Sequence, residues 1–159
     1  MLTKGTTIPT YASLMLDSQN SIRFGKFPLA VVEAQTAFES FFYAFVRHEL
    51  LKKGLMTSTL RAELDKPTPL KQKILKNPAG GKDLDKLEFF SSLVTTPPRS
   101  FANGIAEHDN WFQKTYLVRN KVIHQGKIDV TQKEAEDAFK AAEDSFAFFN
   151  QDWRNLTFQ

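Results

Sequence analysis

The stretch PLAVVEAQTAFESFFYAFVRHELLKKG, residues 28–54, carries a long pattern of apolar residues with helical spacing. These residues recur mostly every third or fourth position, which places them on one wide face of a helix. They are Val31, Ala34, Phe38, Phe41, Phe42, Phe45 and Leu50. Pro28 suits the first residue of a helix and Gly54 suits its end, so the helix is expected to run to about Lys53.

Helical patterns dominate the rest of the chain as well, whereas strand patterns are scarce. Before residue 100, helices are expected over residues 10–22, 58–66, 69–77 and 84–93. Thr10 is expected to cap the first of these, because its hydroxyl can accept a hydrogen bond from a free N–H of the first turn. Pro67 should end one short helix and Pro69 should start the next. Breaks are expected at residues 77–81 and 95–100.

The last third of the chain has the most regular pattern. Residues 103–123 are expected to form one helix, and Gly126 suits its end. Thr131 and Glu134 match a capping box, which fixes the start of a final helix with alanines suited to close packing. We therefore predict an all-α fold, an antiparallel bundle of four to five helices with short extra helices in the middle.

The length of the chain bounds its organisation. With 159 residues it forms about one domain, expected to cover residues 1–159 with its core at about 10–150. Hydrophobic residues make up 42% and charged residues 25%, which is ordinary for a soluble globular protein. The chain has no cysteine, which excludes disulfides and thiolate zinc sites and fits a reducing compartment.

The charge pattern permits contact with nucleic acid but does not require it. The net charge is +3, and the 21 basic and 18 acidic residues are largely interspersed. No apolar run reaches the roughly 20 residues of a membrane span, and the N-terminus lacks a hydrophobic stretch of signal-peptide length. We expect a cytoplasmic protein that does not bind membranes. Whether the chain is one domain of a longer protein stays open.

The stretch LVRNKVIHQGK, residues 117–127, places polar side chains inside an aliphatic run. Burial of ionisable groups is costly unless they are paired or used, so Arg119, Asn120 and His124 are candidate site residues. Five residues on a regular helix separate Arg119 and His124 by about 140°. For the two to cooperate, the helix would have to end or distort between them, and Gly126 indicates an end close by.

An arginine and a histidine together suffice for metal-free cleavage of RNA. The Arg119 guanidinium suits a phosphate, and a histidine such as His124 can take up or release a proton. The ribose 2′-OH would attack the adjacent phosphate, leaving a 2′,3′-cyclic phosphate and a 5′-OH. The alternative is a purely structural polar network at a helix end.

The pattern R-N-x-V-I-H-x-G in residues 119–126 resembles the HEPN family, the "higher eukaryotes and prokaryotes nucleotide-binding" domains with an R-x(4–6)-H motif. The segment SIRFGKFPLAVVEAQTAFESFFYAFVRHELLKKG, residues 21–54, is similar to the first core helices of that family. The resemblance covers residues 10–150, loosely in the middle and well at the motif.

The resemblance implies roles for the motif residues. Arg119 and His124 take the catalytic positions of the family, and Asn120 takes its polar accessory position. Many members are metal-independent endoribonucleases without a cofactor, often toxins or phage-defence effectors, and commonly homodimers with both motifs lining one cleft. Other members have lost catalysis and bind a nucleotide or dock a partner, such as a nucleotidyltransferase antitoxin. RNA and a second copy of the chain are the expected partners.

Two acidic positions and one His-Asp pair are further candidates. Glu33 or Glu39 could hold Arg119 or orient His124, with Glu39 favoured by its large apolar neighbours, or both could lie at the solvated edge of the helix. His108-Asp109 resembles part of the metal site of HD-type phosphohydrolases, but the other expected His ligands are missing.

Basic and aromatic residues elsewhere in the sequence are candidates for an RNA-binding surface. The lysines are Lys71, Lys73, Lys76, Lys82 and Lys86, and the aromatic residues are Trp111, Phe112 and Trp153. The lysines could form a rim along an RNA backbone or a solvated helical face. The aromatic residues could stack on bases, although aromatic residues on regular helices more often belong to the core.

Overall fold

A computed structural model describes residues 8–95, 100–156 and 158. Its helices are α1 (Thr10–Arg23), α2 (Phe27–Lys52), α3 (Ser58–Asp65), α4 (Lys86–Val94), α5 (Ala106–Trp111), the π-helical turn η1 (Phe112–Tyr116), α6 (Leu117–Gln125), α7 (Gln132–Phe149) and the 3₁₀ turn η2 (Trp153–Asn155). The described residues contain no β-strand, only an isolated bridge between Leu75 and Leu84. The prediction of an all-α fold is confirmed.

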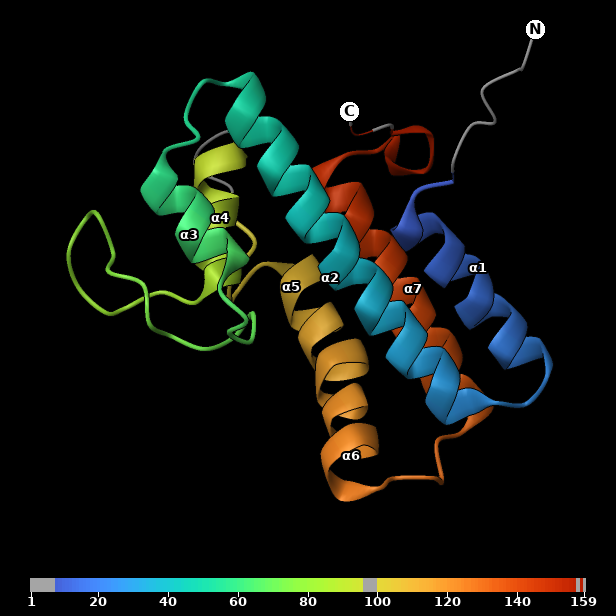
Figure 1. The fold of residues 1–159 in the computed structure, drawn as a ribbon. Coiled ribbons are helices and arrows are strands. Elements are labelled where there is room, and N and C mark those ends of the chain that lie inside the picture. The colour runs from blue at the N-terminus through green and yellow to red at the C-terminus, as the bar shows by residue number, and fades with distance from the viewer. Residues whose placement is uncertain (1–7, 96–99, 157, 159) are drawn as a thin grey trace, which may run out of the picture.

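The long helices form a bundle in which neighbours along the chain run antiparallel (Figure 1). The central helix α2 lies against α7, and these two run in the same direction (Figure 1). Helix α1 flanks this pair on one side, and the continuous column of α5, η1 and α6 flanks it on the other. The short helices α3 and α4 and the loop between them lie beside one end of α2 (Figure 1).

Aromatic side chains of the central helix fill the core. The apolar stripe predicted for α2 is buried, with Phe38, Phe41 and Phe42 fully inaccessible. Tyr11 of α1 meets Phe41 edge-on with ring centroids 5.2 Å apart, and its hydroxyl donates to the carbonyl oxygen of Trp153. Burial of large aromatic rings is the main apolar contribution that holds the helices together.

Small residues allow close helix packing at the end of the bundle where α2 and α7 begin. A second cluster of Ala30, Val31, Val130, Ala135 and Ala138 is buried between the start of α2 and α7. Alanine side chains allow two helix backbones to approach closely, as expected from the sequence. Val118 and Val122 of α6 pack on this cluster, which holds α6 against the bundle although none of its residues is fully buried.

Most helix ends follow their local signals. Thr131 and Glu134 form the predicted capping box, and Gly126 ends α6 at φ +65°, in the left-handed region that favours glycine. Asp85 and Glu88 form a second capping box at α4. Gly54 follows α2 at φ +67°, near the predicted end.

Two local expectations are wrong. Thr10 does not cap α1, because it is the first helical residue and Pro9 occupies the capping position. Residues 69–77 form no helix and belong to the loop between α3 and α4, where Leu75 and Leu84 exchange backbone hydrogen bonds of 3.0 and 2.7 Å. Pro67 and Pro69 lack a backbone N–H, which disfavours a helix at this point. The loop is held by contacts with other segments instead. The break expected at residues 95–100 lies mostly outside the described residues.

The helix predicted over residues 103–123 begins and ends later and contains a distortion. It runs from Ala106 to Gln125, and the turn Phe112–Tyr116 is π-helical. A π-helical turn holds an extra residue, so it rotates the residues that follow relative to a regular helix. The orientation of α6, which carries the Arg–His motif, therefore depends on this turn.

Candidate functional site: the Arg–His motif and the Arg119 pocket

Arg119 lies in the first turn of α6 and is half-buried. Its Nη1 donates a hydrogen bond of 3.1 Å to Oδ1 of Asn120. Its Nε is buried and has no hydrogen-bond partner. A buried donor without a partner costs free energy, so the guanidinium of Arg119 is not fully satisfied by its protein contacts.

Asn120 connects Arg119 with the face of α6 that carries His124. Asn120 and His124 are four residues apart, so they lie about 40° apart on one face, which we call the motif face. His124 is exposed in the last helical turn, before Gly126 turns the chain away. The hydrogen bond from Arg119 to Asn120 therefore brings the guanidinium towards this exposed face.

The expected break between Arg119 and His124 is absent. Helix α6 is continuous from Leu117 to Gln125, and the distortion lies before Arg119 rather than after it. The two residues keep the separation of about 140° that a regular helix gives. Within one chain, Asn120 links them indirectly, and they do not line one pocket.

Arg119 forms part of the wall of a pocket of about 290 Å³. The pocket is lined by Glu39, Tyr43, Pro67, Thr68, Pro69, Leu70, Tyr116 and Arg119, and we call it the Arg119 pocket. Three separate segments contribute to it: α2, the loop after α3, and the column of η1 and α6. Glu39 and Arg119 thus line the same pocket, but no ion pair or hydrogen bond joins these two described residues, so the prediction that Glu39 holds Arg119 stays a prediction.

A chain of hydrogen bonds fixes the carboxylate of Glu39. The buried amide of Gln35 donates from Nε2 to Oε1 of Glu39 at 2.9 Å. The same amide accepts a hydrogen bond of 3.0 Å from Nε1 of Trp111, a fully buried residue. Because Trp111 is packed in the core, the position of the Glu39 carboxylate is set by the core.

A buried lysine lies behind Tyr43. The ammonium of Lys86 donates to the carbonyl oxygens of Leu64, at 3.2 Å, and Lys66. It also lies 5.3 Å from the centre of the Tyr43 ring. Burial, and next the charge of Glu39, raise the pKa of Tyr43 to about 12, so its hydroxyl stays protonated and can donate. Lys86 is fully buried, so its predicted place in a basic rim is wrong.

A second buried polar network lies beside the pocket loop. Nζ of Lys71 forms an ion pair of 2.6 Å with Asp85 and lies 3.1 Å from Nε2 of His108. Because an ammonium can only donate, Nε2 of His108 accepts and Nδ1 carries the proton that is donated to Asp109 at 2.9 Å. Burial lowers the pKa of His108, so the neutral ring is favoured.

This network argues against the HD-type metal site. The ring nitrogen Nε2 of His108 faces the ammonium of Lys71, so this nitrogen is not free to bind a metal ion. The described residues contain no group of three or more His, Cys, Asp or Glu side chains that could hold a metal ion. His108 and Asp109 instead tie α5 to the loop after α3.

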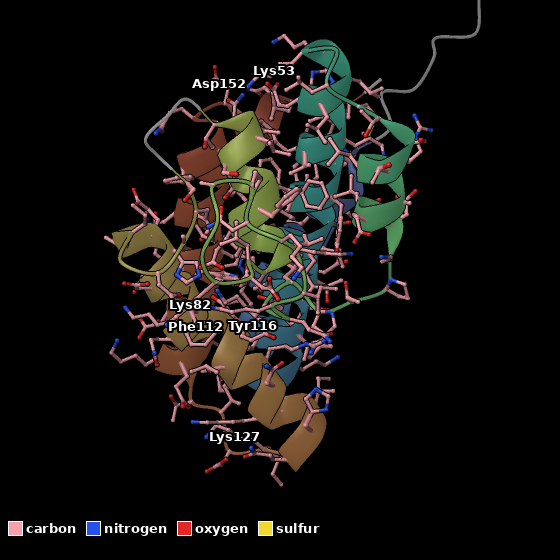
Figure 2. The ribbon with its side chains drawn as sticks, turned by 90° about the vertical axis from the view of Figure 1, so that its left-hand side faces the viewer. Lys53, Lys82, Phe112, Tyr116, Lys127 and Asp152 are labelled. Atoms are coloured by element: carbon pink, nitrogen blue, oxygen red, sulfur yellow. The ribbon has the colours of Figure 1, made fainter. Side chains whose placement is uncertain are left out.

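The remaining candidate residues lie at separate places in the fold. Oε2 of Glu33 is buried without a hydrogen-bond partner, but Glu33 does not line the Arg119 pocket. Trp111 and Trp153 are buried in the core. Phe112 is half-buried, and Figure 2 shows it beside Tyr116, with the two rings stacked 5.5 Å apart. Lys73, Lys76 and Lys82 are exposed on the loop between α3 and α4.

Sequence reasoning missed Gln35, Tyr43, Thr68 and Tyr116. The spacing of Gln35, Glu39 and Tyr43, four residues each, could have placed them on one side of α2. Oγ1 of Thr68 is buried without a hydrogen-bond partner, but this threonine lies in the predicted break between Pro67 and Pro69, where no pattern indicates burial. No local signal joins this loop to α6.

Comparisons with protein-family models, curated proteins and solved structures gave no significant match to this chain. The resemblance of the motif to the HEPN family is therefore a prediction from the motif itself. None of the helices in the described ranges combines the length and the apolar character required to cross a membrane.

Proposed function

We propose that the protein is a metal-independent endoribonuclease of the HEPN type, acting through Arg119, Asn120 and His124. The observation that carries the proposal is the hydrogen bond from Arg119 to Asn120, one helical turn before the exposed His124. This arrangement offers a fixed cation and a titratable imidazole at the solvent-facing end of one helix. The proposal includes a cytoplasmic location and a role as a toxin or phage-defence effector, both of which fit such an activity.

The reaction requires no group beyond the RNA and these side chains. His124 takes the proton of the ribose 2′-OH, and the oxygen attacks the adjacent phosphorus while the bond to the 5′-oxygen breaks. The 5′-oxygen takes a proton from the protonated His124 of a second copy of the chain, which leaves a 2′,3′-cyclic phosphate and a 5′-OH. Arg119 stabilises the negative charge that develops on the phosphoryl oxygens, and Asn120 holds the guanidinium in place.

A homodimer is part of the proposal. Ile123 and Ile128, on α6 and just after it, are 50% and 85% exposed, which leaves apolar surface beside His124. Packing this surface against a second copy would bring two motif faces together. The second His124 would then supply the second proton transfer, which a single imidazole on one chain cannot supply at the same time.

A second candidate function is a non-catalytic module that binds a nucleotide or docks a partner such as a nucleotidyltransferase. One observation favours it: Arg119 lines a pocket that does not include His124. In this alternative, Arg119 binds a ligand and His124 has no part in chemistry.

Digestion of an end-labelled structured RNA in the presence of EDTA tests the two candidates. We expect the wild-type protein to cleave the RNA and to leave 2′,3′-cyclic phosphate ends. The substitution His124→Ala should reduce the rate at least 100-fold, because general acid–base catalysis contributes about 10²- to 10⁴-fold.

Gln125→Ala is the matched control, because Gln125 is exposed in the same helical turn as His124. Its cleavage rate should stay within about twofold of the wild type. Equal cleavage by wild type and His124→Ala would contradict the ribonuclease proposal. A folded wild-type protein that leaves every tested RNA intact would favour the binding module.

A further inference from the structure

The Arg119 pocket holds two opposite charges that do not neutralise each other. Glu39 and Arg119 both line it, yet no ion pair joins these two described residues. Nε of Arg119 and Oγ1 of Thr68 are buried without hydrogen-bond partners. Because the carboxylate of Glu39 can only accept and the guanidinium of Arg119 can only donate, the pocket suits a ligand with donors on one side and an acceptor on another.

The size and the walls of the pocket restrict this ligand further. A volume of about 290 Å³ lies just below the usual range for small-molecule sites, so it suits one ring system rather than a whole dinucleotide. Tyr43, Tyr116 and two prolines supply flat apolar surface. Such surfaces favour a planar aromatic group, and bases of single-stranded RNA commonly stack on aromatic side chains.

The presence of Glu39 selects among planar ligands. A carboxylate repels a free phosphate and accepts hydrogen bonds from two parallel donors. Guanine presents two adjacent donors, N1–H and N2–H, next to the acceptor O6. Adenine, cytosine and uracil would each place an acceptor against the carboxylate as well as a donor. Arginine donors pair well with guanine O6 or N7.

We propose that the Arg119 pocket binds a guanine base, with Glu39 accepting from N1–H and N2–H and the guanidinium of Arg119 donating to O6. This inference rests on the proposed ribonuclease function, in which the guanine belongs to the nucleotide beside the scissile phosphate. Gln35 acts as a positioning residue, since its amide holds the carboxylate through a hydrogen bond of 2.9 Å. The pocket then makes cleavage selective for guanosine.

Binding of mononucleotides tests the base without requiring catalysis. Titration of the protein with GMP, IMP and AMP, followed by NMR, compares bases that carry the same phosphate. We expect GMP to bind best. IMP lacks the N2 amino group and should bind roughly 10-fold more weakly, and AMP about 100-fold more weakly, as expected for hydrogen bonds to a charged group. Equal affinity for the three nucleotides would overturn the proposal.

Two variants separate the base contact from general effects. Glu39→Gln should remove the preference for GMP over AMP while the protein stays folded by its melting temperature. Glu49→Gln makes the same change of charge on the same helix, outside the Arg119 pocket, and should keep the preference. If Glu39→Gln fails to fold, Tyr116→Leu should still lower the affinity for GMP, because it removes part of the flat aromatic wall of the pocket. Retention of the full preference in a folded Glu39→Gln protein would overturn the proposal.

Mapping of cleavage sites distinguishes this inference from the ribonuclease proposal. Cuts that lie next to guanosine would support both. Cleavage without a guanosine preference would overturn the guanine pocket and leave the ribonuclease proposal standing. Selective binding of GMP without any cleavage would support the guanine pocket and contradict the ribonuclease proposal.

Discussion

Gln35 and Glu39, one turn apart on α2, are joined by a hydrogen bond of 2.9 Å that connects the protein core with the Arg119 pocket. Gln35 is fully buried and also accepts from Nε1 of Trp111, so the side chain cannot turn away without leaving a buried donor unpaired. The carboxylate of Glu39 is therefore held in place before any ligand arrives.

The substitution Gln35→Leu should show how much the buried amide contributes to stability. It leaves Nε1 of Trp111 without a partner and releases Glu39, so we expect a loss of about 1–3 kcal/mol in the free energy of unfolding. Denaturant titration measures this loss. Thr36→Ala, an exposed neighbour on the same helix, should change stability by less than about 0.5 kcal/mol. Equal stability of the two variants would show that the buried amide makes no net contribution.

Removal of the Asn120 side chain should reduce RNA cleavage. Asn120 accepts from Nη1 of Arg119 and holds the guanidinium near the motif face. A hydrogen bond to a charged group is worth about 1.5–3 kcal/mol, so Asn120→Ala should lower kcat/KM by roughly 10- to 100-fold. Gln113→Ala changes an exposed residue of the same helical column and should leave the rate nearly unchanged. An unaltered rate for Asn120→Ala would remove Asn120 from the mechanism.

Charge at Ile123 should weaken the proposed homodimer. Ile123 lies on α6 next to His124 and is 50% exposed, and an unpaired carboxylate there would be buried by a second copy at high cost. We expect Ile123→Asp to raise the dissociation constant at least 10-fold in sedimentation velocity experiments. Leu16 is 53% exposed on α1, so Leu16→Asp is a closely matched control. Equal effects of the two substitutions would place the interface elsewhere.

The buried His108 should make stability depend on pH. Its pKa is lowered from 6.5 by burial and further by the nearby Lys71, against the opposing hydrogen bond with Asp109. The unfolded chain then binds more protons than the folded protein below pH 6.5, so stability is full above that pH and falls as the pH decreases. The slope can reach about 1.4 kcal/mol per pH unit, and Asp85 and Asp109 are the carboxylates that face this group.

Unfolding at several pH values between 5 and 8 checks this dependence. His108→Gln should flatten the curve below pH 6.5, whereas Gln113→Ala, an exposed substitution that removes no ionisable group, should leave the slope unchanged. A wild-type slope that persists in His108→Gln would assign the effect to other groups.

Gly126 should be sensitive to the addition of a side chain for backbone reasons alone. Its φ of +65° is strained for other residues, and a Cβ atom built there meets no atom within 4 Å. Gly126→Ala should therefore cost about 1–2 kcal/mol of stability through conformation rather than through a clash. Thermal unfolding of Gly126→Ala beside Gln125→Ala measures this. A cost of less than about 0.3 kcal/mol would show that α6 can end in another way.

Sequence patterns were sufficient where the controlling interactions are local. The apolar stripe of α2, the capping box of Thr131 and Glu134, and the glycine after α6 were all predicted and are confirmed. Sequence patterns failed at Thr10, where Pro9 occupies the capping position instead. They also failed over residues 69–77, where the prolines and the contacts with distant segments outweigh a helical pattern. Lys86 was expected on the surface because lysine is rarely buried, and only the carbonyl groups that surround it explain its burial.

The sequence by itself determined an all-helical bundle, the main helices to within a few residues, and the presence of Arg119, Asn120 and His124 near a helix end. These features depend on spacing and on contacts between residues close in the chain. Only the tertiary structure placed Glu39, Thr68 and Arg119 around one pocket, and only it positioned the π-helical turn that orients α6. The physical reason is that packing between distant segments decides which helix faces meet, and that information lies in no single stretch of the chain.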